Sequence, residues 1–530
     1  MLYKCNLLSR FFPAKFFLIG NNYVSQPQGV LPMSSFDVSA CLIVKNAETS
    51  LPRCLASIAD LVRELVVVDT GSKDATVSRV QPLGCRVYHF PWTDDFAAAR
   101  NESIRHSTSR WIFWIDDDEY VDEPNREKLR ALLASRANEE AAYMMTQRSA
   151  SATGSPRDLQ HVRLFRNHPR IRWQYRVHEQ IAPALLLAGH AIRATDIVIQ
   201  HSGYQNAQVH LQKLQRNARL LELDLHDHPN DGFVLFNLGT AYEELGRTAE
   251  AITLLRQSLE QSPAGFSTIR DTYAALLQCQ RRLGQNDEAW AVCLEGRRRF
   301  PDDVSLLFWQ SQLLSDRGDL GGAEKCLLEL MALKPGSYLG AADAGIRKYI
   351  APHTLGLVYW EQGRIREAEK QWQAVVADHP QYRDSWQMLA EMYLVQKRWT
   401  DLEAIIARCE AKAEWVSDGA ILRARLHLAK KEFAAARTIL NQLIAQNPQA
   451  MAPRFHLTHV LLGEGQDWQA AEQALRDLLK IDPRQPQGWY NLVALLRRQN
   501  RLPEARQMCT IGLKHCPGDA NLARLDKSMH

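Results

Sequence analysis

Acidic side chains occur where two apolar segments of the sequence stop. Asp69 follows the run 65–68, and the segment 111–115 leads into Asp116-Asp117-Asp118-Glu119. In parallel sheets ligands bind beyond the carboxyl ends of the strands, so these acids can meet at one edge. Asp116 and Asp118, one residue apart, offer oxygen ligands to Mg²⁺ or Mn²⁺, which takes its other ligands from water and phosphate. The alternative is a solvated acidic turn that caps the next helix, but the apolar residues before the turn favour the metal.

The elements that must position these acids alternate between strands and helices. Short apolar, β-branched runs predict strands, and between them apolar residues at helical spacing predict helices. The expected strands are 38–44, 65–68, 86–90 and 111–115, and the expected helices are 48–62, 74–80 and 95–106. Such alternation predicts a mostly parallel sheet that is covered by helices, an α/β fold.

Four motifs in this half, in order, resemble a known family. They are Cys41-Leu-Ile-Val-Lys-Asn46, Val68-Asp-Thr-Gly-Ser-Lys-Asp74, Phe96-Ala-Ala-Ala-Arg-Asn101 and Trp114-Ile-Asp-Asp-Asp-Glu119. The succession is similar to family 2 glycosyltransferases of the GT-A (Rossmann-like) fold. Within them it resembles the subgroup related to the sublancin-type peptide S-glycosyltransferase. The resemblance covers residues 38–205 and implies a nucleotide-sugar donor, UDP-linked, with a divalent metal, Mn²⁺ or Mg²⁺.

The resemblance also implies roles for individual residues on the donor side. Asp69 would accept a hydrogen bond from the uracil N–H, and Lys45 and Asp74 would line the same nucleotide site. Asp74 has an alternative role as a helix cap. Asp116 would contact the ribose and the metal, and Asp118 would hold the metal on the diphosphate, where it neutralises the charge of the leaving group.

Arg100 and Asn101 are also predicted to bind the donor. For Arg100 the alternative is an ion pair with the acidic edge. His201 ends a further apolar strand and, by resemblance, would complete the metal site; the alternative is a structural histidine.

The predicted catalytic base is Glu179, in a Val177-His178-Glu179 motif that resembles one in the same subgroup. An inverting transfer needs one carboxylate to take the acceptor proton. The alternative for Glu179 is an ion pair with Arg172 or Arg176. The six arginines between residues 157 and 178 predict the lining of a diphosphate and acceptor cleft.

The second half of the sequence repeats itself. Prolines recur at 229, 263, 301, 335, 380, 448, 483 and 517, at intervals of 34 residues or 34 with insertions. Small and aromatic residues recur in phase with them, such as Gly239 and Tyr242. This period is that of tetratricopeptide repeats, which are pairs of antiparallel helices, and about eight repeats fit. Such an array predicts a concave surface for a protein or peptide partner, or for a second copy of the chain in a homodimer.

These patterns predict four segments: residues 1–36 as a disordered leader or an over-extended start, 37–205 as the GT-A domain, 206–229 as a connecting helix and 230–530 as repeats. The formal charge of the 530 residues is only +4, which argues against a nucleic-acid partner. No apolar stretch is long enough for a transmembrane segment. The ten cysteines form no CxxC pair, which indicates reduced thiols and a cytoplasmic location.

The sequence therefore predicts an inverting glycosyltransferase for hexosyl or N-acetylhexosaminyl transfer, with a protein or peptide acceptor recruited by the repeats. Transfer to a lipid-linked or surface polysaccharide precursor is an alternative. A second alternative is a non-catalytic scaffold that keeps the GT-A domain only as a fold.

Overall fold

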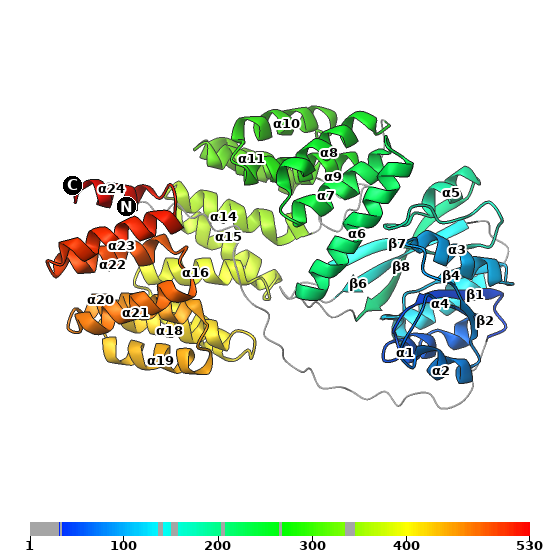
Figure 1. The fold of residues 1–530 in the computed structure, drawn as a ribbon, viewed down its shortest axis with the longest axis horizontal. Coiled ribbons are helices and arrows are strands. Elements are labelled where there is room, and N and C mark those ends of the chain that lie inside the picture. The colour runs from blue at the N-terminus through cyan, green and yellow to red at the C-terminus, as the bar shows by residue number, and fades with distance from the viewer. Residues whose placement is uncertain are drawn as a thin grey trace. The chain divides into compact units, whose positions relative to one another are not determined.

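The computed structural model describes residue 31 and residues 34–135, 141–149, 157–202, 207–263, 268–333 and 345–529. Most of the predicted leader, residues 1–30, lies outside the described residues. The chain divides into two compact units, Met1–Gln371 and Trp372–His530 (Figure 1). The first unit contains the predicted catalytic domain together with the first helix pairs of the array.

One mixed sheet forms the centre of the amino-terminal half, with strand order β3-β2-β1-β4-β7-β6-β8-β5. The first four strands in this order are parallel to one another, and β7 joins β4 antiparallel. The strands are β1 (Val38–Val44), β2 (Glu64–Asp69), β3 (Arg86–His89), β4 (Trp111–Trp114), β5 (Glu119–Tyr120), β6 (Ala141–Ser149), β7 (Arg157–Arg166) and β8 (Ala191–His201). This confirms the predicted α/β fold of GT-A type, with an antiparallel extension after the parallel strands.

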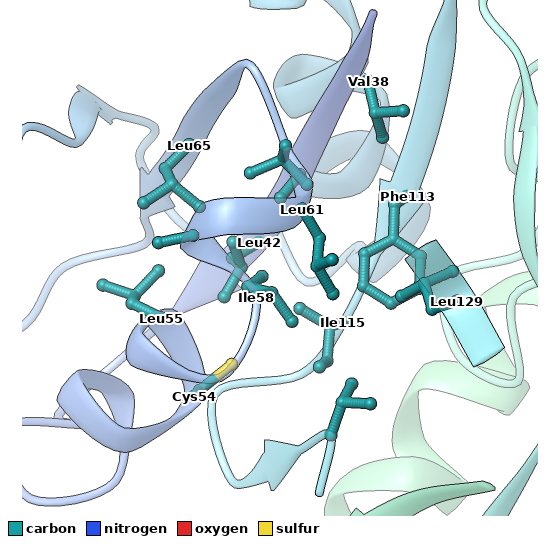
Figure 2. Packing of buried hydrophobic residues seen from close by; sticks show 14 of the residues in the cluster. Val38, Leu42, Cys54, Leu55, Ile58, Leu61, Leu65, Phe113, Ile115 and Leu129 are labelled. Carbon is teal, nitrogen blue, oxygen red and sulfur yellow. The ribbon is translucent and has the colours of Figure 1, made fainter. Parts of the chain in front are cut away.

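The strands bury different side chains on their two faces, because successive residues of a strand point to opposite sides. Val38, Leu42 and Phe113 lie in one core with residues of α1 and α4, and Figure 2 shows these side chains pointing toward one another. Cys41 and Trp114 lie in a second core on the other face. Both faces are thus covered, which explains the continuous apolar runs of these strands.

The helices of this half are shorter than predicted in two places. They are α1 (Leu51–Ala56), α2 (Thr76–Val80), α3 (Phe96–His106), α4 (Glu123–Ser135) and α5 (Ala182–Leu187), with 3₁₀ turns at Ala59–Leu61 and Gln81–Leu83. The helix predicted over 48–62 ends early because the Ser57 hydroxyl turns back to the Cys54 carbonyl. The helix predicted from 74 begins at Thr76 because Asp74 accepts the Thr76 N–H in front of it. The start of α3 agrees with the prediction, since Asp95 caps it through the Ala98 N–H.

A single long helix, α6 (Ala207–Asp227), precedes the array, and eight helix pairs follow within the described ranges. The pairs are α7 (Gly232–Glu244) and α8 (Thr248–Gln261), α9 (Ile269–Arg282) and α10 (Asn286–Arg299), α11 (Val304–Asp316) and α12 (Leu320–Ala332), α14 (Ala351–Glu361) and α15 (Ile365–Asp378), α16 (Arg383–Val395) and α17 (Trp399–Glu410), α18 (Val416–Ala429) and α19 (Phe433–Gln446), α20 (Met451–Glu464) and α21 (Trp468–Ile481), and α22 (Pro486–Arg498) and α23 (Leu502–His515). A π-helical turn, Ile346–Ile350, leads into α14, and α24 (Ala520–Lys527) follows the last pair.

The recurring prolines and small residues have the effects that the repeat predicts. Pro263 and Pro301 each stand two residues beyond the end of a second helix, where the proline disfavours a further helical turn. At Gly239 an added Cβ would lie 2.8 Å from Leu255 Cγ of the partner helix. A larger residue there would push α7 and α8 apart. Among the helices that the structure describes, none has the length and apolar character needed to cross a membrane.

Candidate active site

The predicted acids lie at one edge of the sheet. Asp69 is the last residue of β2, and β4 leads directly into Asp116. Both strands run parallel to β1, which lies between them. Since neighbouring strands lie about 4.8 Å apart, the ends of β2 and β4 are about 10 Å apart. The edge therefore carries acidic groups at two positions separated by one strand.

Arg100 connects this edge to the predicted base. On α3, its Nη2 donates to Asp116 Oδ1 at 2.9 Å and its Nε donates to Glu179 Oε1 at 2.8 Å. The side chain of Arg100 is only 11% exposed. Burial alone would lower the pKa of Arg100, but the two carboxylates raise it above its ordinary value and keep the charge fixed. Glu179 thus has an ion pair, as its alternative role predicted, but with Arg100 and not with Arg172 or Arg176.

Nearby charges shift the pKa values of Asp116 and Asp117 in opposite directions. Burial would raise the pKa of Asp116, but the charges of Arg100 and Arg163 lower it below its ordinary value. For Asp117 the largest charge effects come from acids instead. Burial, with the charges of Asp118 and Asp116, raises the pKa of Asp117 to about 7. Asp116 therefore keeps its negative charge at neutral pH, while Asp117 is only partly ionised.

Asp118 and His201 lie close together, although they are far apart in the sequence. Strands β5 and β8 pair so that Glu119 lies opposite His201. His201 Nε2 is 3.2 Å from Asp118 Oδ2, and Ser149 Oγ lies 3.2 Å from the other ring nitrogen. The contact with Asp118 raises the pKa of His201 despite its partial burial. A carboxylate and an imidazole in this arrangement fit the two protein ligands of a divalent cation that takes its other ligands from phosphate and water. No group of three or more histidine, cysteine, aspartate or glutamate side chains suited to a metal occurs among the described residues.

On the nucleotide side of the edge, Asp69 and Asp74 organise two loops. Asp69 is buried, and its carboxylate accepts the N–H groups of Gly71 and Ser72. Asp74 lies one residue before Ala75, the N-cap of α2; it accepts the N–H of Thr76, the first residue of α2, and the Glu48 N–H at 3.2 Å. Lys45 follows β1 at the same edge and is exposed. Contact of Asp69, Lys45 and Asp74 with a nucleotide stays a prediction.

Asn101 fixes the backbone near the base. Its side-chain amide donates to the Trp173 carbonyl at 3.0 Å and accepts the Trp173 N–H at 2.8 Å. This holds the segment that precedes Glu179 against α3. The donor contact predicted for Asn101 stays a prediction.

Comparisons with known proteins agree with this geometry. The family model described as Glycosyl transferase family 2 matches residues 39–186, and tetratricopeptide repeat models match residues 233–264, 353–407 and 460–520. A TPR repeat-containing protein of Synechococcus elongatus is 33% identical over 308 residues, which are 56% of this chain and 76% of that protein. This chain contains a glycosyltransferase family 2 domain followed by tetratricopeptide repeats.

Two further relatives of this chain carry glycosyltransferase names. The SPbeta prophage-derived glycosyltransferase SunS of Bacillus subtilis is 26% identical over 47% of this chain and 60% of SunS. The lipopolysaccharide core biosynthesis glycosyltransferase LpsC of Rhizobium meliloti is 32% identical over 29% of this chain and 58% of LpsC. The alignments thus span less than two thirds of these two relatives.

The basic segment of the glycosyltransferase differs from the prediction. Arg163 does not line a cleft: it is fully buried in β7 and pairs with the fully buried Glu119, with both Nη–Oε distances at 2.7 Å. Arg172 donates to backbone carbonyls, and Arg176 pairs with Asp224 and Asp227 on α6. Arg163, Arg172 and Arg176 thus bind acceptors within the fold. The cleft lining predicted for the other arginines of this segment stays a prediction.

Sequence reasoning missed the buried group formed by Trp114, Arg163 and Glu119 beside this site. The Trp114 ring lies 3.8 Å from the Arg163 guanidinium carbon and 4.3 Å from that of Arg100. Glu119 also accepts the Asp116 N–H at 2.9 Å, so the buried pair shapes the acidic turn. His161 lies beside the same ring, and burial lowers its pKa to about 4. One signal was available: Arg163 is a lone charge within the apolar run Val162–Phe165.

Proposed function

We propose that this family 2 glycosyltransferase is an inverting enzyme that transfers a hexosyl or N-acetylhexosaminyl group from a UDP-sugar to an acceptor. The observation that carries the proposal is the position of Arg100 between Asp116 and Glu179. It brings an acid of the donor-side turn and an acid from a distant loop to one guanidinium. A donor and an acceptor that meet here would each contact one of the two acids.

Asp118 and His201 would hold the divalent cation, Mn²⁺ or Mg²⁺, and Asp116 would contact the ribose and the same cation. When bound, this cation neutralises the charge that develops on the departing UDP. Asp69, Lys45 and Asp74, which end or follow β2 and β1 at the same edge of the sheet, would line the nucleoside site. The fit rests on the 3.2 Å approach of Asp118 and His201.

Glu179 would act as the general base. The acceptor atom attacks the anomeric carbon and forms the new bond, its proton passes to the Glu179 carboxylate, and the bond to UDP breaks with the electron pair leaving on the phosphate oxygen. Arg100 holds the Glu179 carboxylate in one orientation through its Nε. Attack opposite to the leaving group inverts the configuration of the sugar.

The acceptor in this proposal is a cysteine, serine or threonine side chain of a protein or peptide that the repeats recruit. Two features support it: the repeat array, an architecture that offers a surface to partner chains, and the resemblance to the peptide S-glycosyltransferase subgroup. A homodimer through the repeats is the other use of that surface.

A second acceptor class has support of its own. The relative LpsC, which is 32% identical over 165 residues, is named for lipopolysaccharide core biosynthesis. A lipid-linked or surface polysaccharide acceptor would fit the same donor site. A host lysate supplied with radiolabelled UDP-sugar separates the two classes, because the label enters either the protein precipitate or the lipid and polysaccharide extract.

The catalytic proposal is tested by UDP release from UDP-glucose, UDP-galactose and UDP-N-acetylglucosamine with Mn²⁺, using the full chain. The Glu179→Gln variant should bind UDP within about twofold of the wild type but release UDP about 100–10,000-fold more slowly. Glu123→Gln is a matched control, because Glu123 lies on α4, is exposed and contacts only Arg126 among the recorded ion pairs of the described residues. Full turnover by Glu179→Gln would remove the base from the mechanism. If the wild type neither binds UDP nor releases it from any of the three donors, the chain is a non-catalytic scaffold.

A further inference from the structure

The loop that carries Glu179 has an unusual backbone. It leaves β7 and is closed by two hydrogen bonds of 3.0 Å between the backbones of Gln174 and Gln180. Within it, Tyr175 has φ +71° and His178 has φ +57°. Side chains with a Cβ are disfavoured in this left-handed region. The surrounding structure must therefore hold the loop in this shape.

The tip of the loop is buried in the repeats and not in the sheet domain. Trp173 and Ile181, on either side of the loop, belong to a core of the sheet. Val177, between them, is 5% exposed and belongs to the core formed by α6 and the first helix pairs, with Leu221 and Val234. Residue 177 is thus packed in the repeat core between two residues of the sheet core, and Glu179 lies between Val177 and Ile181.

Polar contacts hold the same loop to the first repeat helices. The Arg176 N–H donates to Asp224 Oδ2 at 2.9 Å, and Asp224 lies on α6 and is only 4% exposed. The Tyr175 hydroxyl donates at 2.9 Å to Asp231, the residue that caps α7. Its ring lies 4.9 Å from the ring of Phe233, on the first turn of the same helix.

The loop is also tied to the helix that holds the base. The Arg176 carbonyl accepts the N–H of Phe96, the first residue of α3, at 2.9 Å. Arg100 lies one turn further along α3 and binds Glu179. A second contact fixes the two helices, since Arg219 of α6 pairs with Asp94, just before α3. Residue 176 is therefore held from one side by α6 and from the other by α3.

We propose that Asp224 is a positioning residue for Glu179, so that the first repeat helices form part of the catalytic centre. The proposal rests on the proposed role of Glu179 as the base. By accepting the Arg176 N–H, Asp224 fixes the loop at a point three residues before Glu179. Without it, the loop relaxes from its left-handed conformations and the carboxylate leaves the position set by Arg100. Donor binding, which uses Asp69 and the acidic turn rather than the contact with α6, is unaffected.

The Asp224→Ala variant of the full chain tests the proposal in the UDP-release assay. We expect kcat to fall at least tenfold while the donor KM stays within twofold, because the base is misplaced and the donor site is intact. Asp224→Asn keeps an oxygen that accepts the Arg176 N–H, so it should recover kcat to within about threefold of the wild type. Glu222→Ala is the matched control: Glu222 lies on the same helix, but it binds Tyr242 and Arg247 of the repeats, and kcat should stay within twofold.

The possible outcomes separate this inference from the proposed function. Unchanged kcat in Asp224→Ala, or a parallel loss of donor affinity, would overturn the positioning role while leaving the base in place. Full activity of Glu179→Gln would instead overturn the base itself. If Asp224→Ala does not fold, Tyr175→Phe decides, because it removes one hydroxyl from the same contact surface. A fall in its kcat of about three- to tenfold at constant donor KM supports the proposal, and wild-type kinetics contradict it.

Discussion

The sheet domain and the repeats use arginine in different ways. In the sheet, Arg163 and Glu119 form a single ion pair with side chains that are 0% exposed. In the repeats, an arginine at the start of the second helix recurs at Arg247, Arg364 and Arg398. Each lies over a tyrosine of the preceding helix, at 3.5, 4.1 and 4.4 Å, and each binds an acid three residues further on. These repeated side chains are 36–40% exposed.

The buried ion pair of the sheet and the repeated arginines have different structural consequences. A buried ion pair loses the hydration of two charges, so a pair of apolar residues of similar size stabilises a fold at least as well. The pair in the sheet has a local consequence, since Glu119 also holds the Asp116 N–H and Arg163 lies against Trp114. The repeated arginines have no such local consequence and mark the junction between successive helices. A buried charge that occurs once therefore indicates a functional site. A charge that recurs with the repeat indicates a role in packing successive helices.

Removal of Arg163 is the strongest way to test this contrast. Arg163→Met leaves Glu119 buried without its cation, and we expect the sheet domain to lose about 3–5 kcal/mol of unfolding free energy. Urea denaturation of the full chain, followed through its first transition, measures the loss. UDP release should fall as well, because the acidic turn loses the anchor at Glu119.

The double variant Arg163→Met with Glu119→Leu is the control for this prediction. It removes both charges, so we expect most of the stability to return while UDP release stays low. Recovery of stability together with full activity would show that the buried pair is structural only. A buried, single ion pair would then not indicate a functional site, in contrast to what we infer from the comparison with the repeats.

Asp224, at the contact between the two regions, gives a smaller and pH-dependent effect. Burial raises the pKa of Asp224 to about 6, although the Arg176 N–H and guanidinium partly oppose this. The folded chain therefore binds this proton more tightly than the unfolded chain, so stability falls as pH rises from about 4 to about 6 and stays reduced above it. Asp224→Asn removes this charge and should raise the unfolding free energy by about 1–2 kcal/mol at pH 7.5, with about half that gain at pH 5.

Thermal unfolding of the wild type and Asp224→Asn across this pH range measures the effect. Glu222→Gln, on the exposed face of α6, is the control and should show no such dependence. A gain that is equal at both pH values would mean that the charge of Asp224 is not what limits stability. A less stable Asn variant at pH 7.5 would mean that its pairing with Arg176 outweighs its burial.

The sequence predicted what depends on local pattern and missed what depends on distant contacts. The strand ends near Asp69 and Asp116, the helix start near Asp95 and prolines such as Pro263 and Pro301 after second helices follow from runs of residues close in the chain, and the structure agrees with them. The pairing of Arg100 with Glu179 joins residues 79 positions apart, and no local pattern indicates it.

Packing across the domain boundary was also out of reach of the sequence. Val177 reads as one apolar residue of the catalytic domain, but it is buried in the repeat core. Arg163 reads as one of six basic residues, and only the fold shows that Glu119 lies within reach. Periodicity specifies the repeats because each helix pair packs against its neighbours in the chain. The sheet depends on strand order, which brings β7 beside β4 and so places Arg163 under the acidic turn.

The smallest expected effect is in the repeats, at Arg364. Its guanidinium binds Glu324 of α12 at 2.7 Å and Glu367 on its own helix, and it lies over Tyr359. Because this contact is partly exposed and recurs along the array, Arg364→Gln should lower the melting temperature by less than about 2 °C and leave UDP release unchanged. Differential scanning calorimetry at low and high salt measures it, and the difference should shrink at high salt as the charges are screened. A loss as large as that of Arg163→Met would show that the repeated arginines also act as individual anchors, and the distinction between the two regions would not hold.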